Sequence, residues 1–354
     1  MNCIVYTVAY NEEKNISKAI ESIIAQTYTD WVYYVVDNGS ADATWEIIQD
    51  YAAKDSRIIP RQNKTNGVFE PDVHYNDILR QYSPDDYFCW LDADDEYLPQ
   101  FLEKTMHFAL ENTLDVVMCG YYTVELDEFG QEQKKFVFAP SKTLVLRQDD
   151  FIGRSDDFGN YFYCMRSIWA KLYRVKTFLA INLPESVYGA YGRDILQATT
   201  AIRIADAIGT LPEAVYIYYV KPRASKYNFT HKHVESTQLQ DQYTRDFLIE
   251  KYGYITANNE VAIQQIYMRQ INNMLSILRG DQSLTGGDVI NHLYSILSHP
   301  KARALFGSGY ISKDILTNQC RVPLVSWLQQ FKEFNEEAYA GKILEIIKIL
   351  KGEG

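Results

Sequence analysis

The chain contains few cysteines, and no two of them stand in a Cys-x-x-Cys spacing. The five cysteines are odd in number and scattered over the 354 residues: Cys3, Cys89, Cys119, Cys164 and Cys320. This pattern argues against a disulfide framework and against a zinc site. We therefore expect reduced, mostly buried thiols, as in a cytoplasmic protein.

Long apolar runs are also missing. No stretch approaches the roughly 18 consecutive apolar residues that mark a membrane-spanning helix. The first residues, MNCIVYTVAYNEEKN, have no basic region and only a short apolar run, which predicts a first strand and not a signal peptide. A cytoplasmic location is the expectation that follows.

Positive charge is in deficit. The chain has 35 Lys and Arg against 46 Asp and Glu, a formal net charge of −11. Nucleic-acid binding needs a basic face, so no nucleic acid is expected as a partner. The rest of the composition, 47% hydrophobic and 23% charged, is that of a globular chain with one large domain or two modest ones.

Two phosphate-binding motifs are absent as well. No Gly-x-Gly-x-x-Gly follows the first predicted strand, so a dinucleotide-binding Rossmann fold loses its main support. No Gly-x-x-x-x-Gly-Lys-Ser/Thr occurs either, which excludes a P-loop.

Predicted strands and helices alternate through the first 120 residues. The strands are short apolar runs, and the helices carry apolar residues at helical spacing. The predicted strands are Cys3–Ala9, Trp31–Val36, Arg57–Pro60, Tyr87–Leu91 and Asp115–Cys119, and the predicted helices are Glu12–Gln26, Ala41–Ala53, Asp72–Tyr82 and Leu98–Glu111. This alternation predicts an α/β fold whose parallel sheet is covered by helices on both faces.

The pattern changes after residue 120. A hairpin is predicted at Tyr121–Leu126 and Lys134–Phe138, helices at Ser167–Phe178 and Arg193–Ala207, and a tyrosine-rich strand at Ala214–Val220. From about His231 onward the pattern is nearly all helical. We therefore expect one domain over residues 1–230 and a helical region over residues 231–354.

Polar residues follow three of the predicted strands at their carboxyl ends. Tyr10-Asn11-Glu12 follows the first strand, Asp37-Asn38-Gly39-Ser40 the second, and Asp92-Ala93-Asp94-Asp95 a later one. Ligands of open α/β sheets bind beyond these strand ends. The three clusters are therefore expected to converge on one crevice.

The most acidic cluster, WLDADDEY at 90–97, places three carboxylates within four positions. Unpaired carboxylates repel one another, so a positive group is expected beside them. Asp-x-Asp at a strand end suits Mn²⁺ or Mg²⁺, which carboxylates and substrate phosphates coordinate together. The alternative is that Asp94 or Asp95 caps the helix predicted at Leu98–Glu111.

Four segments together resemble family 2 glycosyltransferases of the bacterial type, which have the GT-A fold. They are TVAYNEEKNISKAIESIIAQTYTDWVYYVVDNGSADAT (7–44), WLDADDEYLP (90–99), IWAKLYRVKTF (168–178) and YIYYVKPRASKY (216–227). The segments stand in the family's order and cover about residues 1–227. The resemblance implies a mostly parallel, mixed sheet flanked by helices. It also implies inverting transfer of a sugar from a nucleoside-diphosphate sugar to an acceptor hydroxyl.

The same resemblance assigns roles to residues. It places the nucleotide of a UDP-sugar at Ala9, Tyr10, Asn11, Glu12, Asp37, Asn38, Asp92 and Ala93. It puts Asp37 on the base, Asp92 by the ribose or donor sugar, and Asp94 on Mn²⁺ or Mg²⁺. These roles are physically sensible, because a carboxylate accepts a pyrimidine N–H and a tyrosine ring stacks on a base. Taken alone, Tyr10 is explained by packing and Asp37 by turn formation.

A carboxylate base for the acceptor hydroxyl is also implied. The matching place reads Tyr191-Gly192-Arg193-Asp194, in which Asp194 is retained and Arg193 replaces the usual Glu. This Arg is expected to depress the pKa of Asp194 and to weaken it as a base. The alternative role of Asp194 is a favourable charge at a helix start, and Glu185 is the second candidate for the base.

Positive residues after the tyrosine-rich strand form the last candidate group. Arg223 and Lys226 could hold the diphosphate, and His231 or His233 could complete the metal shell. The alternative for both histidines is a solvated loop. The family's Ala-Arg-Asn reads His74-Tyr75-Asn76 here, so the Arg that would contact the donor is missing.

The sequence leaves the acceptor and the role of residues 231–354 undecided. The acceptor could be a glycan, a lipid-linked oligosaccharide or a glycoprotein, and residues 231–354 could form an acceptor wall or an oligomer interface. The helix predicted at Lys342–Lys351 could instead contact the inner face of the membrane. Two other functions are a nucleotidyltransferase, which would need a basic loop where Asn11-Glu12-Glu13 stands, and a non-catalytic sugar-nucleotide-binding module.

Overall fold

The computed structural model describes residues 2–66, 74–147, 150–151, 154–184, 192–221, 229–281, 283–307, 324, 327–328 and 337–351. The chain divides into two compact units. The sheet unit consists of Met1–Pro222 and Phe247–Gly253, and the helical unit of Arg223–Asp246 and Tyr254–Gly354.

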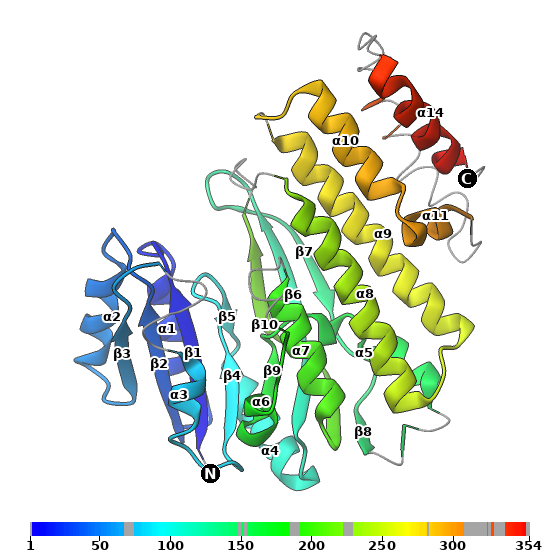
Figure 1. The fold of residues 1–354 in the computed structure, drawn as a ribbon. Coiled ribbons are helices and arrows are strands. Elements are labelled where there is room, and N and C mark those ends of the chain that lie inside the picture. Colours follow the sequence, from blue (N-terminus) through cyan, green and yellow to red (C-terminus); the bar gives the residue numbers. More distant parts are fainter. Residues whose placement is uncertain are drawn as a thin grey trace. The chain divides into compact units, whose positions relative to one another are not determined.

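One sheet runs through the described part of the sheet unit (Figure 1). Its strands are β1 (Cys3–Ala9), β2 (Trp31–Asp37), β3 (Ile58–Gln62), β4 (Tyr87–Trp90), β5 (Glu96–Tyr97), β6 (Val116–Leu126), β7 (Glu132–Phe138), β8 (Leu144–Arg147), β9 (Lys171–Arg174) and β10 (Ala207–Val220). Their order is β3-β2-β1-β4-β9-β6-β10-β5, with β7 on β6 and β8 on β10.

The sheet is mixed. Strands β3, β2, β1 and β4 pair in parallel, as do β6 and β10. The pairs that β9 makes with β4 and β6, and those of β5, β7 and β8, are antiparallel. The mostly parallel, mixed sheet that the resemblance implied is confirmed, because the longest ladders, β6 with β10 and β1 with β2, are parallel.

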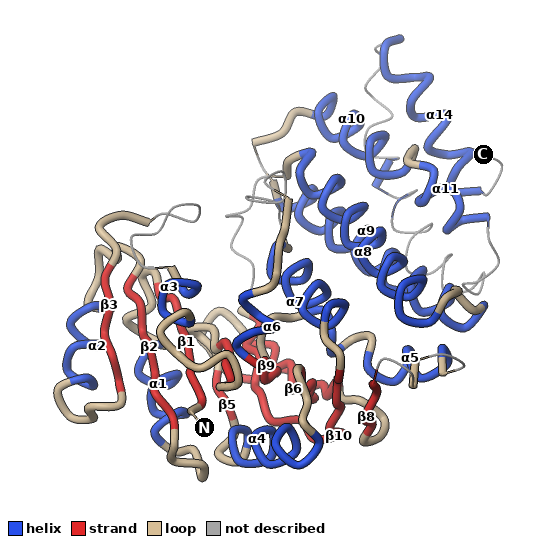
Figure 2. The backbone as a smooth tube through the Cα atoms, turned by 60° about the horizontal axis from the view of Figure 1, so that its bottom comes forward, coloured by secondary structure: helices blue, strands red, loops and turns tan. Residues whose placement is uncertain are grey.

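Helices cover both faces of this sheet. They are α1 (Ile16–Ile24), α2 (Thr44–Ala52), α3 (Tyr75–Leu79), α4 (Phe101–Asn112), α5 (Phe158–Tyr161), α6 (Val175–Leu179) and α7 (Arg193–Ile204). Helices α4 and α7 lie on opposite sides of the strands (Figure 2). In α1 the apolar stripe at Ile16, Ala19, Ile20 and Ile23 is fully buried, so hydrophobic burial decides which face meets the sheet. The predicted α/β alternation is confirmed.

The helix predicted at Ser167–Phe178 is wrong. Lys171–Arg174 is a strand, and only α6, which begins at Val175, is helical. Strand β9 pairs with β6 at Leu172↔Val117 and with β4 at Phe88↔Tyr173. These long-range pairings override the local helical pattern, which is a weak determinant by itself.

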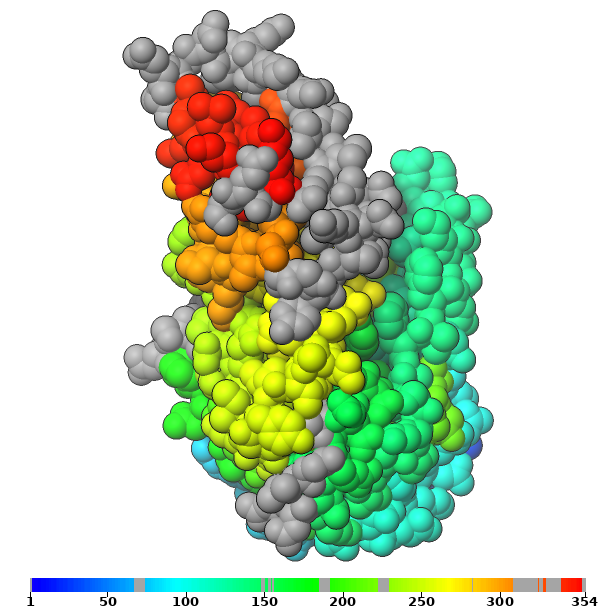
Figure 3. Space-filling view, turned by 90° about the vertical axis from the view of Figure 1, so that its right-hand side faces the viewer, coloured from blue at the N-terminus to red at the C-terminus, as the bar shows by residue number. Residues whose placement is uncertain are grey.

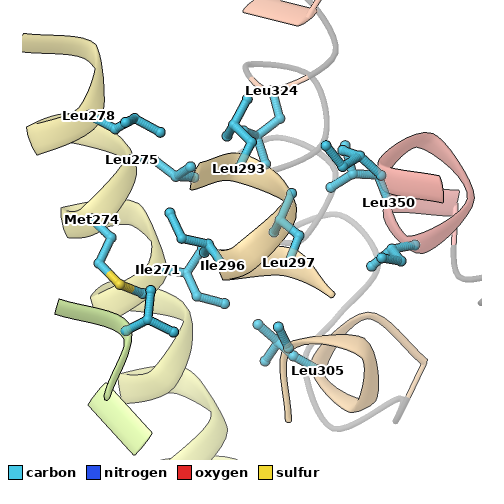
Figure 4. Packing of buried hydrophobic residues seen from close by; sticks show 14 of the residues in the cluster. Ile271, Met274, Leu275, Leu278, Leu293, Ile296, Leu297, Leu305, Leu324 and Leu350 are labelled. Atoms are coloured by element: carbon cyan, nitrogen blue, oxygen red, sulfur yellow. The ribbon is translucent and has the colours of Figure 1, made fainter. Parts of the chain in front are cut away.

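The helical unit is built from α8 (His231–Tyr252), α9 (Ala257–Gly280), α10 (Gly286–Leu297), α11 (Pro300–Gly307) and α14 (Glu337–Lys351). Its core lies between α9, α10, α11 and α14, where leucines and isoleucines interdigitate (Figure 4). In the space-filling view α14 (red) lies against α10 (orange) (Figure 3). A capping box of Thr285 and Asp288 starts α10.

Within the described ranges, none of the helices combines the length and the apolar character that crossing a membrane requires. Helix α8 belongs to both units, because its last residues fall in Phe247–Gly253. The helical pattern expected from His231 onward is present over residues 231–252, 257–280, 286–297, 300–307 and 337–351.

Candidate active site

The carboxyl ends of β1, β2 and β4 lie side by side, because β1 pairs in parallel with both neighbours. The Asn11 N–H donates to Ser40 Oγ at 2.9 Å, and the Ala41 N–H donates to Asn11 Oδ1, also at 2.9 Å. Leu91, which directly precedes the acidic segment (residues 92–95), donates its N–H to the Tyr6 carbonyl at 3.0 Å. The structure thus brings the three polar clusters to one edge of the sheet.

The residues assigned to the nucleotide differ in exposure. Asp37 is fully buried, and its carboxylate accepts hydrogen bonds from the Gln62 amide at 3.0 Å and the Ser40 N–H at 3.2 Å. Asn38 is buried beside it. Tyr10, by contrast, is 45% exposed, so its ring is open to a stacking partner.

Asp92 follows β4 and is half-buried, next to the buried Ala93. Its Oδ1 accepts a hydrogen bond from the Trp90 indole N–H at 2.9 Å. Burial raises the pKa of Asp92 to about 7, with a further contribution from the negative charges of Asp94 and Asp194. A cation bound nearby would favour the ionised form of this carboxyl group.

Asp95 fastens the acidic segment to β10. Its Oδ2 accepts from the Tyr216 hydroxyl at 2.7 Å, and its Oδ1 accepts from the Tyr219 N–H at 2.9 Å. Helix α4 begins only at Phe101, so neither Asp94 nor Asp95 caps it. The capping alternative for these carboxylates is therefore wrong.

A lysine sits beside Asp94. Lys221 Nζ lies 3.0 Å from Asp94 Oδ2 and 3.9 Å from Glu12 Oε2. Burial and the charge of Asp94 raise the pKa of Glu12, and the charge of Lys221 lowers it. The positive group expected next to the acidic segment is, in this structure, a side chain of the chain itself.

The donor atoms around this lysine suit a hard divalent cation. Asp94 and Glu12 turn carboxylate oxygens toward one positive group, and carboxylate oxygens are the ligands that Mn²⁺ and Mg²⁺ prefer. Among the residues that the structure describes, no three Asp, Glu, His or Cys side chains are grouped as a metal site. Substrate phosphates would have to complete the shell, as is usual for Mg²⁺.

Asp194 is the second residue of α7 and follows Gly192, whose φ of 77° favours glycine. Its side chain reaches solvent, yet protein surrounds it closely enough that desolvation raises its pKa. Backbone N–H groups at the start of α7 and the charges of Arg166 and Lys171 lower that pKa. The charge of Asp194 in turn contributes to the raised pKa of Asp92, after burial and the charge of Asp94.

The expectation that Arg193 depresses the pKa of Asp194 is wrong. Desolvation dominates, so the pKa is raised, and Arg166 and Lys171 are the cations that act against the rise. The charge of Arg193 lowers the pKa of His74 instead, after burial of that ring. The neighbouring Arg is not among the largest influences on the pKa of Asp194.

Sequence reasoning missed Trp90, Lys171 and Lys221. Lys171 is fully buried, and its Nζ donates to the Ser167 carbonyl at 2.5 Å and to Ser167 Oγ at 3.0 Å. Burial lowers the pKa of Lys171 to about 7. No local signal marks it, because a lysine in this segment fits a helix surface equally well. Lys221 could have been found as the first cation after the tyrosine-rich strand.

Three candidates fall outside the described residues: Glu185, Arg223 and Lys226. His231 and His233 belong to the helical unit. His231 Nδ1 lies 3.2 Å from Ser295 Oγ, and His233 is buried with its ring stacked on Phe229. The roles suggested for these five residues stay predictions.

Comparison with known proteins finds similarity to one family and to several named relatives, two of which are described here. Residues 4–173 match the family described as Glycosyl transferase family 2. EpsJ, an uncharacterized glycosyltransferase of Bacillus subtilis (strain 168), is 26% identical over 239 residues, which are 66% of this chain and 65% of EpsJ. TuaG of the same organism, named for teichuronic acid biosynthesis, is 30% identical over 137 residues, 38% of this chain and 52% of TuaG. The chain thus spans less than two thirds of either relative.

The fold also has a solved counterpart. S. aureus TarS 1-349, crystallised in complex with UDP, matches 99% of this chain and 90% of its own with a TM-score of 0.57, at 20% identity. This likeness indicates a GT-A-like fold. The family match covers the strands from β1 to β9 and, with them, the acidic segment. These findings make residues 4–173, just under half of the chain, similar to glycosyltransferase family 2.

Proposed function

We propose that this chain transfers a sugar from a UDP-sugar to a hydroxyl group of its acceptor, by an inverting, metal-dependent displacement. The family match over residues 4–173 favours glycosyl transfer over the nucleotidyltransferase and the non-catalytic module that the sequence left open. The observation that carries the proposal is that Asp94 Oδ2 and Glu12 Oε2, from two strand ends, lie 3.0 and 3.9 Å from one positive group. Asp94 would hold the metal there, Asp92 would contact the donor, and the charge of Asp194, the proposed base, raises the pKa of Asp92.

UDP is the proposed nucleotide of the donor. The TarS structure of the same fold contains UDP. The open ring of Tyr10 can stack on uracil, and an ionised Asp37 has lone pairs left for the base N–H. Because Asp37 is fully buried, neighbouring side chains such as Gln62 have to move before the base can reach it.

Asp194 is the proposed base. The acceptor oxygen attacks the anomeric carbon while its proton passes to the Asp194 carboxylate, and the bond from that carbon to the diphosphate oxygen breaks. A raised pKa suits this role, because it brings the base closer to neutral pH. The solvent access of the side chain leaves a path for the acceptor.

Mn²⁺ or Mg²⁺ would neutralise charge on the diphosphate leaving group. Asp94 would be its protein ligand, and Glu12 is placed to assist through one of its carboxylate oxygens.

The proposed acceptor is a glycan, a lipid-linked oligosaccharide or a glycoprotein, and we favour a precursor of a cell-surface polysaccharide. TuaG, a relative over the first part of the chain, is named for teichuronic acid biosynthesis. The proposed location is the cytoplasm, at or near the inner membrane face.

The test is UDP release from a panel of UDP-sugars, with Mn²⁺ and with chelator. We expect one donor to be hydrolysed slowly, and only with Mn²⁺. Asp94→Asn should abolish this hydrolysis, and Asp194→Asn should bind the donor but lose transfer to an acceptor by about 100-fold or more. If the protein neither bound nor turned over any UDP-sugar, the UDP assignment would be refuted. The panel would then be repeated with GDP-, dTDP- and CDP-sugars.

A further inference from the structure

The ion pair between Lys221 and Asp94 joins two parts of the chain that are far apart in sequence. Its N–O distance is 3.0 Å, and the same ammonium group lies 3.9 Å from Glu12 Oε2. Lys221 is thus the positive charge between two carboxylates of different strand ends. Both carboxylates are only partly exposed, at 35% for Asp94 and 24% for Glu12.

The position of Lys221 is fixed by the strand before it. Lys221 directly follows β10, and Asp95 holds β10 through Tyr216 and the Tyr219 N–H. β10 also pairs with β5, at Tyr216↔Tyr97 and Ile217↔Glu96. The backbone of Lys221 is therefore held in place beside Asp94. Its side chain is 43% exposed, so the ammonium group has room to move away from Asp94.

One carboxylate cannot serve the lysine and a divalent cation equally. An ammonium group at hydrogen-bond distance occupies the oxygen that a metal would bind, and its charge repels the metal. We propose that Lys221 stands in the place of the metal beside Asp94 when no donor is bound, and that the metal displaces it. This inference rests on the metal dependence proposed above.

The presence of Lys221 beside Asp94 explains how the acidic segment stays folded before the donor binds. Burial raises the pKa values of Asp92 and Asp95, and the negative charge of Asp94 raises both of them further. Lys221 supplies one positive charge to this segment in the donor-free state. A metal supplies two positive charges, and with the donor present it also holds the phosphates, so it competes with the lysine more strongly when the donor is bound than when it is absent.

Mn²⁺ binding without any nucleotide tests the proposal, measured by the loss of the free Mn²⁺ signal in electron paramagnetic resonance. Lys221→Met should bind Mn²⁺ about fivefold more tightly than the wild type, the size expected for losing a partly exposed ion pair. Lys221→Arg, which keeps the charge, should bind it as the wild type does. In a protein that carries Asp94→Asn, adding Lys221→Met should no longer change the Mn²⁺ affinity.

Lys104→Met is the matched control. Lys104 pairs with Glu213 at 3.3 Å with similar exposure, 42%, in the same unit. It should leave Mn²⁺ affinity unchanged, whereas a general effect of losing one positive charge would raise the affinity of both variants.

Equal or weaker Mn²⁺ binding by Lys221→Met would overturn the proposal, and so would the absence of binding in both the wild type and this variant. The proposed function is judged separately, by Mn²⁺-dependent UDP release from the sugar panel. A wild type that turns over donor while Lys221→Met shows no gain in Mn²⁺ affinity would refute only the role of Lys221.

Discussion

At the scale of single residues, Trp90 decides how the Asp92 carboxylate is held. Its ring packs on Tyr6 at a centroid distance of 4.9 Å and on Tyr75 at 5.8 Å, while its N–H points to Asp92. The aromatic packing fixes the indole, and the indole fixes the carboxylate. One side chain thus connects the core of the sheet unit to the proposed donor site.

Trp90→Phe should weaken binding of UDP with Mn²⁺ about tenfold. The ring packing is largely kept, but Asp92 loses a hydrogen bond to its ionised form, and bonds to charged groups contribute about 1.5–3 kcal/mol. Isothermal titration calorimetry measures the change. The pKa of Asp92 should also rise further, because this bond lowers it.

Trp31→Phe is the control for Trp90→Phe. The Trp31 indole N–H is buried without a hydrogen-bond partner among the described residues, so its removal breaks no bond. Its UDP affinity should equal that of the wild type. Equal losses in both variants would mean that indole packing, and not the bond to Asp92, supports the donor.

Arg166→Met should move the acid limb of the pH–rate profile to higher pH. Asp194 must be ionised to act as a base, so activity falls as the pH drops through its pKa. Desolvation already places that pKa above the ordinary value, and the charge of Arg166 lowers it. Removing this charge raises the pKa, which kcat/KM measured across pH would report.

Arg203→Met, at the other end of α7, is the matched loss of charge. It pairs with Glu250 at 3.4 Å and is not among the groups that shift the pKa of Asp194 most. Its profile should overlay that of the wild type. An acid limb that stays in place in Arg166→Met would argue that Asp194 is not the titrating base.

At the scale of elements, Asp95 connects the acidic segment to β10 through the two hydrogen bonds that its carboxylate accepts from that strand. Asp95→Ala should lower the free energy of unfolding by about 2–4 kcal/mol, because it leaves the buried Tyr216 hydroxyl and Tyr219 N–H without their acceptor. Guanidinium unfolding measures this loss. Asp95→Asn keeps one acceptor oxygen and should lose less. Equal stability of all three proteins would refute the fastening role of Asp95.

The strand ends could be predicted from the sequence, because parallel strands place their carboxyl ends at one edge whatever their exact pairing. Asp37, Asp92 and Asp94 follow such ends, and the structure brings their segments together. The position of Lys221 depends on the register of β10 against β5 and β6, partners about a hundred residues away, which no local pattern contains. The strand at Lys171–Arg174 was missed for the same reason.

The desolvation of Asp194, whose side chain still reaches solvent, was equally out of reach. Sequence alone put Arg193 beside Asp194 and inferred a lowered pKa. The structure shows that desolvation exceeds the effect of nearby cations. Burial depends on the packing of whole elements around α7, so adjacency along the chain predicts its electrostatic consequence poorly.

At the scale of the whole molecule, the two units have separate hydrophobic cores. The core of the helical unit includes Ile271, Leu293, Leu297 and Leu350, all at most 1% exposed. Tyr10, Asp37, Asp92 and Asp94, which are proposed to bind the donor and its metal, all belong to the sheet unit. The stability of the helical unit and the affinity for UDP can therefore be changed independently.

Leu293→Ala should destabilise the helical unit by about 2–5 kcal/mol, because it leaves a cavity in that core. Its affinity for UDP with Mn²⁺ should stay within about twofold of the wild type. Leu172→Ala, a fully buried change in β9, is the counterpart in the sheet unit. In scanning calorimetry Leu172→Ala should lower the midpoint temperature of the sheet unit's transition. UDP should raise the midpoint of that same transition, since a ligand stabilises the part that binds it. A single transition whose midpoint temperature falls in both variants and rises with UDP would mean that the two cores unfold together, as one cooperative unit.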